Sequence, residues 1–84
     1  MEEQRIERVK FRIPSWDEAA QFMKKIASEF NAAIEVRDAA QLISTNGFEL
    51  TFHPDDRGFA HITCKIRDRS MAPALKALFA PYTA

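Results

Sequence analysis

Near its beginning, the chain shows a strict alternation of apolar and charged residues. In residues 7–13, Val9, Phe11 and Ile13 alternate with three basic side chains. A period of two is typical of a β-strand that buries one face and exposes the other. Pro14 has no amide N–H for a further ladder bond, so the strand is predicted to end at residue 13.

An amphipathic helix is predicted over residues 15–30. Ser15 and Glu18 fit a capping box, in which the serine hydroxyl accepts a hydrogen bond from the Glu18 amide. Asp17 and Glu18 also lie at the positive end of the helix dipole. The residues that follow form one apolar stripe at spacings of three and four: Trp16, Ala19, Ala20, Met23, Ile26, Ala27 and Phe30.

Four further elements follow the same rules. Short strands are predicted over residues 34–37 and 41–45, and a longer strand over residues 59–66. The last helix is predicted over residues 70–82. Ser70 is its expected N-cap, Pro73 lies in the first turn, where proline is tolerated, and Pro81 is expected to fray the end.

These elements predict one α+β domain over residues 1–84. Two amphipathic helices need a common apolar surface, and each strand offers one apolar face. We therefore expect an open-faced sandwich, in which an antiparallel four-stranded sheet has two or three helices packed on one face.

Composition narrows the classes of function. The chain has 12 Lys and Arg against 12 Asp and Glu, so any attraction to nucleic acid or to a membrane must come from a local patch. The first residues contain no apolar region typical of a secretory signal, and no apolar run reaches the roughly 20 residues of a membrane span. The single Cys64 has no partner for an internal disulfide. A cytoplasmic location is predicted.

No residue set indicates catalysis. His53 and His61 are the only histidines, and parity places His61 and Cys64 on opposite faces of their strand, where they cannot share a metal. Cys64 belongs to the inward row and is expected to behave as a small apolar side chain. The two glycines do not form a phosphate-binding loop. We expect no catalytic residue, no metal and no cofactor.

The outward face of the sheet carries the most prominent surface feature. Arg8, Lys10 and Arg12 project together from the first strand, and His61 and Lys65 would join them if their strand lies next to it. Such a face is suited to phosphates or to an acidic partner. It is also what an exposed sheet needs in order to stay soluble. No exposed aromatic side chain is expected among these residues to stack on bases.

The segment around the first helix resembles the histidine-containing phosphocarrier protein HPr of sugar phosphotransferase systems. The resemblance rests on the Ala19-Ala20-x-Phe22 segment and extends over most of the chain as a pattern of elements. It implies an HPr-like sheet and a short helix near residues 48–52. The phosphorylated histidine of the family falls at Ser15 and its assisting arginine at Asp17, so phosphocarrier chemistry is not expected.

Residues 46–53 allow two interpretations. Asn46-Gly47, followed by alternating apolar residues, favours a β-hairpin. The resemblance to HPr favours a helix instead, and the sequence leaves both open.

Two functional hypotheses follow, and neither is an enzyme. The first is an HPr-like protein-binding or regulatory domain that docks a partner through the start of the first helix, at Ser15, Trp16 and Asp17. The alternative is a small binding protein, such as an inhibitor from a phage or mobile element, that uses its basic sheet face. Another protein is the expected partner, with nucleic acid as the alternative; no membrane contact is expected, and the oligomeric state is left open.

Overall fold

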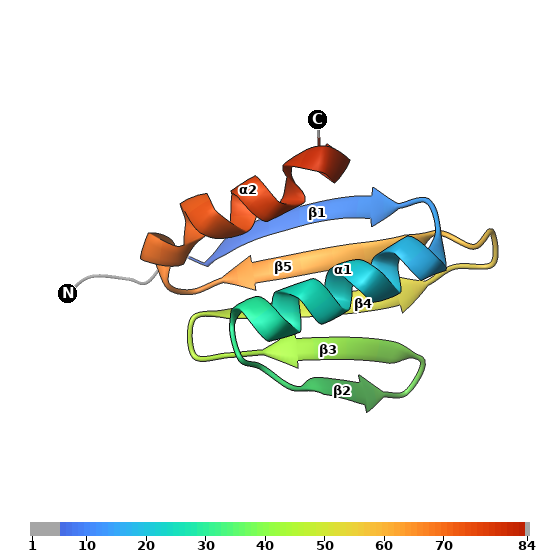
Figure 1. Cartoon of the computed structure of the whole chain (residues 1–84), viewed down its shortest axis with the longest axis horizontal. Helices are drawn as coiled ribbons and strands as arrows, with labels where there is room; N and C mark the ends of the chain where they lie inside the picture. The colour runs from blue at the N-terminus through green and yellow to red at the C-terminus, as the bar shows by residue number, and fades with distance from the viewer. Residues whose placement is uncertain (1–5, 84) are drawn as a thin grey trace.

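The computed structural model describes residues 6–83 and has two helices on one face of a single sheet (Figure 1). Residues 1–5, which belong to the N-terminal segment in which no secretory signal is predicted, lie outside the described part. The elements, in chain order, are β1 (Glu7–Ile13), α1 (Trp16–Glu29), β2 (Ile34–Arg37), β3 (Ala40–Ser44), β4 (Phe48–Pro54), β5 (Ala60–Ile66), a 3₁₀ turn η1 (Arg69–Met71) and α2 (Ala72–Thr83).

The sheet has five strands in the order β1-β5-β4-β3-β2, and every neighbouring pair is antiparallel. The predicted α+β class and the antiparallel open sheet with helices on one side are confirmed. The predicted number of four strands is wrong, because residues 48–54, whose sequence allows either a strand or a helix, form an additional strand.

That additional strand, β4, is the middle of the sheet. It bonds β3 on one side and β5 on the other, so that Leu50 lies opposite both Ile43 and Cys64. The Thr45 side chain secures the preceding turn, because its Oγ1 accepts from the amides of Gly47 at 3.2 Å and Phe48 at 3.3 Å. Local alternation therefore predicted this segment correctly, and the helix implied by the resemblance to HPr is not present there.

The first helix begins as predicted. Ser15 is its N-cap in extended conformation, and the Ser15 hydroxyl accepts from the Glu18 amide at 3.4 Å. The helix ends at Glu29, and the chain turns at Asn31, whose φ of 53° lies in the left-handed region that asparagine tolerates. The predicted range of 15–30 differs by one residue at each end.

The start of the last helix needs a correction. Ser70 is not the N-cap of α2 but lies inside the 3₁₀ turn, where its hydroxyl donates to Oδ1 of Asp68 at 2.6 Å. Asp68 is the capping residue, because the same oxygen also accepts from the Ser70 amide at 3.0 Å. Pro81 lies within the helix rather than fraying it, and α2 continues to Thr83.

The core fills the space between the sheet and the helices. Phe11 of β1 contacts the aromatic rings of both helices, with centroid distances of 6.1 Å to Phe22 and 4.9 Å to Phe79. Burial of such rings, at about 25 cal/mol per Å² of apolar surface, is the main stabilising contribution. The largest fully buried side chains are Phe48, Phe52, Phe79, Ile13, Met23, Ile26, Ile43, Leu50, Ile62, Ile66, Leu75 and Cys64.

Candidate functional site

The sheet register brings together the basic residues of two strands that lie far apart in sequence. Arg8 of β1 lies directly opposite Lys65 of β5, and Arg12 lies opposite His61. Lys10 lies between them, opposite Thr63. These side chains alternate with the buried rows of β1 and β5, so they lie on the opposite face of the sheet. Figure 1 shows that both helices cover the buried face. We call this set the basic face: Arg8, Lys10, Arg12, His61 and Lys65. The register shows that two adjacent strands supply it, as predicted.

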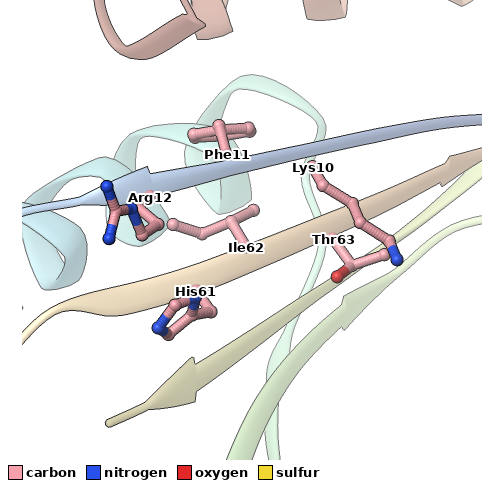
Figure 2. Close-up of a pocket in the computed structure, with 6 residues that line it drawn as sticks. All are labelled: Lys10, Phe11, Arg12, His61, Ile62 and Thr63. Carbon is pink, nitrogen blue, oxygen red and sulfur yellow. The ribbon is translucent and has the colours of Figure 1, made fainter.

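A shallow hollow of about 390 Å³ lies on this face along the seam of β1 and β5. Figure 2 shows Lys10 and Thr63 at one end of it and Arg12 and His61 at the other. Phe11 and Ile62 also line it, so the hollow has both apolar and cationic parts. An open depression of this kind suits contact with a surface rather than enclosure of a small molecule.

The cations of β1 are not neutralised by neighbouring acids. Among residues 6–83, no ion pair involves Arg8, Lys10 or Arg12. On the same open face, Glu49 of β4 lies opposite Lys65 and pairs with Arg67 at 3.5 Å. Like charges directly opposite each other in a sheet oppose folding. The pair of Arg8 and Lys65 is thus unfavourable, and Glu49 on the other side of Lys65 offsets part of that repulsion.

One aromatic ring at this face was missed in the sequence analysis. The guanidinium carbon of Arg12 lies 5.2 Å from the centroid of the Phe59 ring, a cation–π contact. The ring is half-buried. The sequence contained a signal for this position, because Phe59 lies two residues before His61 and so belongs to the same outward row. Because the ring is partly buried and the Arg12 guanidinium lies over it, Phe59 is not an exposed platform of the kind that stacks on bases.

Asp55 holds the end of the basic face in place. Its Oδ1 accepts from the amides of Arg57 at 2.8 Å and Phe59 at 2.9 Å, which shapes the loop before β5. Its Oδ2 lies 2.7 Å from Nε2 of His61. The bond to His61, followed by the two backbone amides, lowers the pKa of the Asp55 carboxyl below its ordinary value.

We expect Asp55→Asn to lower stability at neutral pH and to lose that effect in acid. A carboxyl with a lowered pKa stabilises the fold above its unfolded pKa of about 3.9, and that stabilisation is lost as the pH falls through the folded value. The urea midpoint of the variant should therefore fall below that of the wild type near pH 7, and the gap should narrow from about pH 4 downward.

The control for this prediction is Asp56→Asn, which removes an exposed carboxylate from the same loop. It should leave the midpoint almost unchanged. A gap between Asp55→Asn and the wild type that stays constant into acid would contradict a role for the charge of Asp55.

The other predicted docking position, at the start of α1, lies in the helix layer rather than on the basic face. Ser15 is committed to capping the helix. Trp16 is half-buried and packs against the core, while Asp17 is exposed. The structure therefore separates these three residues from the basic ones, and for Ser15 and Trp16 it shows contacts within the fold.

Cys64 has no access to solvent. Its side chain is fully buried in β5 on the helix side of the sheet. Burial, with a smaller contribution from the charge of Glu7, raises the pKa of this thiol to about 12. The nucleophilic thiolate is therefore scarcely populated at neutral pH. Within residues 6–83, no group of three or more His, Cys, Asp or Glu side chains could hold a metal ion.

Comparisons with protein-family models, with curated proteins and with solved structures give no match to this chain. In the part of the chain that the structure describes, neither helix has the length and apolar character to cross a membrane. The fold and the site define an α+β domain with an exposed cationic sheet face.

Proposed function

We propose that this chain is a non-catalytic binding domain whose basic face docks an acidic surface of another protein. The observation that carries the proposal is the register of β1 and β5. It places Arg8 opposite Lys65 and Arg12 opposite His61 on the side of the sheet without helices. Complementary charge of this kind steers association and selects partners more than it adds affinity.

The open face is shaped for a broad contact. Thr51 and Thr63 lie opposite each other on β4 and β5, so hydroxyl groups continue the polar surface beside the cations. A flat array of cations and hydroxyl groups fits a surface of carboxylates and backbone carbonyls, which can accept from both.

Acidic protein is favoured over nucleic acid by the scarcity of aromatic platforms. Binding of single strands relies on bases stacked on exposed aromatic rings. Phe59 is half-buried, and the guanidinium of Arg12 lies over its ring. The cations therefore carry most of the recognition, and nucleic acid is kept as an outcome of the test below.

The proposal rests on the basic face rather than on the start of α1. The HPr-like hypothesis placed docking at Ser15–Asp17, where two of the three side chains serve the fold. The strand at Phe48–Pro54 also stands where the resemblance implies a helix. Absence of catalysis is part of the proposal and is supported by the burial of Cys64. A cytoplasmic location is part of the proposal and is supported by the single cysteine, which has no partner for an internal disulfide.

The test uses polyglutamate and an oligothymidylate of equal charge as probes. Wild-type protein should bind polyglutamate, and added salt should weaken the complex. The triple variant Arg8→Gln, Lys10→Gln, Arg12→Gln should bind about tenfold more weakly, since three exposed charges at about 0.5 kcal/mol each sum to a tenfold change in affinity. Fluorescence anisotropy of labelled probes measures both affinities.

The matched control removes three exposed cations elsewhere, with Lys24→Gln, Lys25→Gln and Arg69→Gln. This control should bind polyglutamate as the wild type does. Equal affinities of the two triple variants would refute a role for the basic face. A tighter complex with oligothymidylate than with polyglutamate would assign the face to nucleic acid instead of protein.

A further inference from the structure

The two edges of the sheet differ in how they oppose association. Along the β1 edge, Arg8, Lys10 and Arg12 present like charges to any approaching copy of the chain. Within residues 6–83, no strand pairs with the outer side of β2. On the helix side of that strand, Val36 is 71% exposed and Ile34 is 39% exposed. An unguarded edge with apolar residues is a template for pairing with another strand.

The hydrogen bonds at the turn between β3 and β4 show which residues of β2 direct their backbone groups to the free edge. The Thr45 amide donates to the Phe48 carbonyl at 2.9 Å. In an antiparallel sheet, alternate residues bond opposite neighbours, so odd-numbered residues of β3 bond β4 and even-numbered residues bond β2. The register pairs those even-numbered residues with Glu35 and Arg37. The remaining two residues of β2 therefore direct their N–H and C=O groups to the free edge.

Those two residues are Ile34 and Val36, and they restrict how a second copy can pair. Two antiparallel copies related by a two-fold axis bond only if outward-directed residues lie opposite each other. The axis must then pass through a residue rather than between two residues.

The charges select among these registers. An axis at Glu35 places the two Glu35 residues opposite each other, so that two negative charges meet. An axis at Arg37 places the two Arg37 residues opposite each other, so that two positive charges meet. An axis at Ile34 leaves both charged residues without an opposite charge across the interface. An axis at Val36 places each Glu35 opposite an Arg37, twice, on the open face of the sheet. Directly opposite pairs of opposite charge stabilise a sheet, whereas like charges destabilise it.

We propose that two copies of this chain pair through β2, about a two-fold axis at Val36, into one continuous antiparallel sheet. The Val36 residues exchange both backbone hydrogen bonds, and their side chains meet on the helix side. Glu35 and Arg37 lie at a non-hydrogen-bonded pair, where the Cα atoms approach to about 4.5 Å and the side chains are closest. Within one chain these two side chains already lie on the same face, with 3.9 Å between Arg37 Nη2 and Glu35 Oε1.

The proposed dimer is weak. The paired strand has four residues, so the interface belongs to the small class below about 1,200 Å² that is typical of transient contacts. Its two basic faces lie on the same side of the joined sheet, because the two-fold axis is perpendicular to that sheet. The proposal is independent of the binding function, since neither Glu35 nor Arg37 belongs to the basic face.

Charge reversal tests the register directly. Sedimentation velocity over a series of protein concentrations should show the wild type passing from monomer to dimer. Glu35→Arg alone and Arg37→Glu alone should each remain monomeric at concentrations where the wild type is dimeric, because each places like charges opposite each other twice. An equimolar mixture of the two variants should form a heterodimer, in which both charge pairs are again attractive. The double variant E35R/R37E should dimerise as the wild type does.

Separate measurements test whether each variant keeps its fold and whether the β2 edge forms the dimer. Both side chains are exposed, so circular dichroism of each variant should match that of the wild type. Val36→Pro, which removes an amide directed to the free edge, should abolish the dimer with the fold retained. Dimerisation of the single charge variants at the wild-type concentration, or no association of the mixture, would overturn the register. A wild type that stays monomeric at the highest concentration would overturn the dimer, without bearing on polyglutamate binding.

Discussion

Replacement of Phe52 by alanine is expected to lower the free energy of unfolding by about 3–5 kcal/mol. Phe52 is fully buried in β4, the middle strand of the sheet, where it lies opposite Ile62 of β5. Its ring centroid lies 6.4 Å from that of Phe22 on α1, so the side chain joins the sheet to the helix layer. Truncation removes apolar contacts and leaves a cavity that strands bonded on both sides cannot close.

This loss is large relative to the total free energy of unfolding. A small domain has a free energy of unfolding of about 5–10 kcal/mol, so Phe52→Ala should leave a marginally folded protein. Urea unfolding followed by circular dichroism measures the difference. Thr51→Ala is the matched control, because Thr51 lies on the same strand but on the open face, and its loss should cost less than about 1 kcal/mol. Equal losses in the two variants would contradict the assignment of Phe52 to the core.

Gly47→Ala is expected to cost about 1–3 kcal/mol. Gly47 is buried in the turn between β3 and β4, and its carbonyl accepts from the amides of Arg67 at 2.8 Å and Asp68 at 3.0 Å. A Cβ at this position would overlap the thioether sulfur of Met71 and lie 3.1 Å from Cβ of Asp68. The turn must shift, or Met71 must leave its place against the core.

A double-mutant cycle identifies the cause. If overlap with the thioether is responsible, Gly47→Ala should cost much less in a Met71→Ala background, and the two substitutions should be non-additive. Additive costs would indicate that the turn itself, rather than Met71, resists the added methyl group. Asn46→Ala, at the exposed neighbouring position, is the control for changes to the turn.

Local sequence patterns predicted most elements of this fold because each has a short-range cause. The capping box at Ser15 is made by residues three apart, and the structure places the helix start there. The alternation of Phe48, Leu50 and Phe52 predicted a strand, whereas the resemblance to HPr implied a helix. The strand is present because these three side chains must all enter one core face.

Predictions at the start of the last helix were less accurate, since two residues of similar capping ability compete there. Asp68 and Ser70 both favour an N-cap, and their order in the 3₁₀ turn depends on the bonds from Arg67 and Asp68 to Gly47. Those bonds connect residues about twenty positions apart and leave no local signal.

Sequence alternation is enough to say which side chains share a face of each strand, because the alternation of side chains belongs to the backbone of any strand. The row of Arg8, Lys10 and Arg12 and the separate row of His61 and Lys65 are therefore visible in the sequence. The position of β1 beside β5 is known only from the folded sheet, since alternation specifies a face but not a neighbour or a register. The same holds for β2: its apolar residues predicted a strand, and only the order of the sheet left that strand at an open edge.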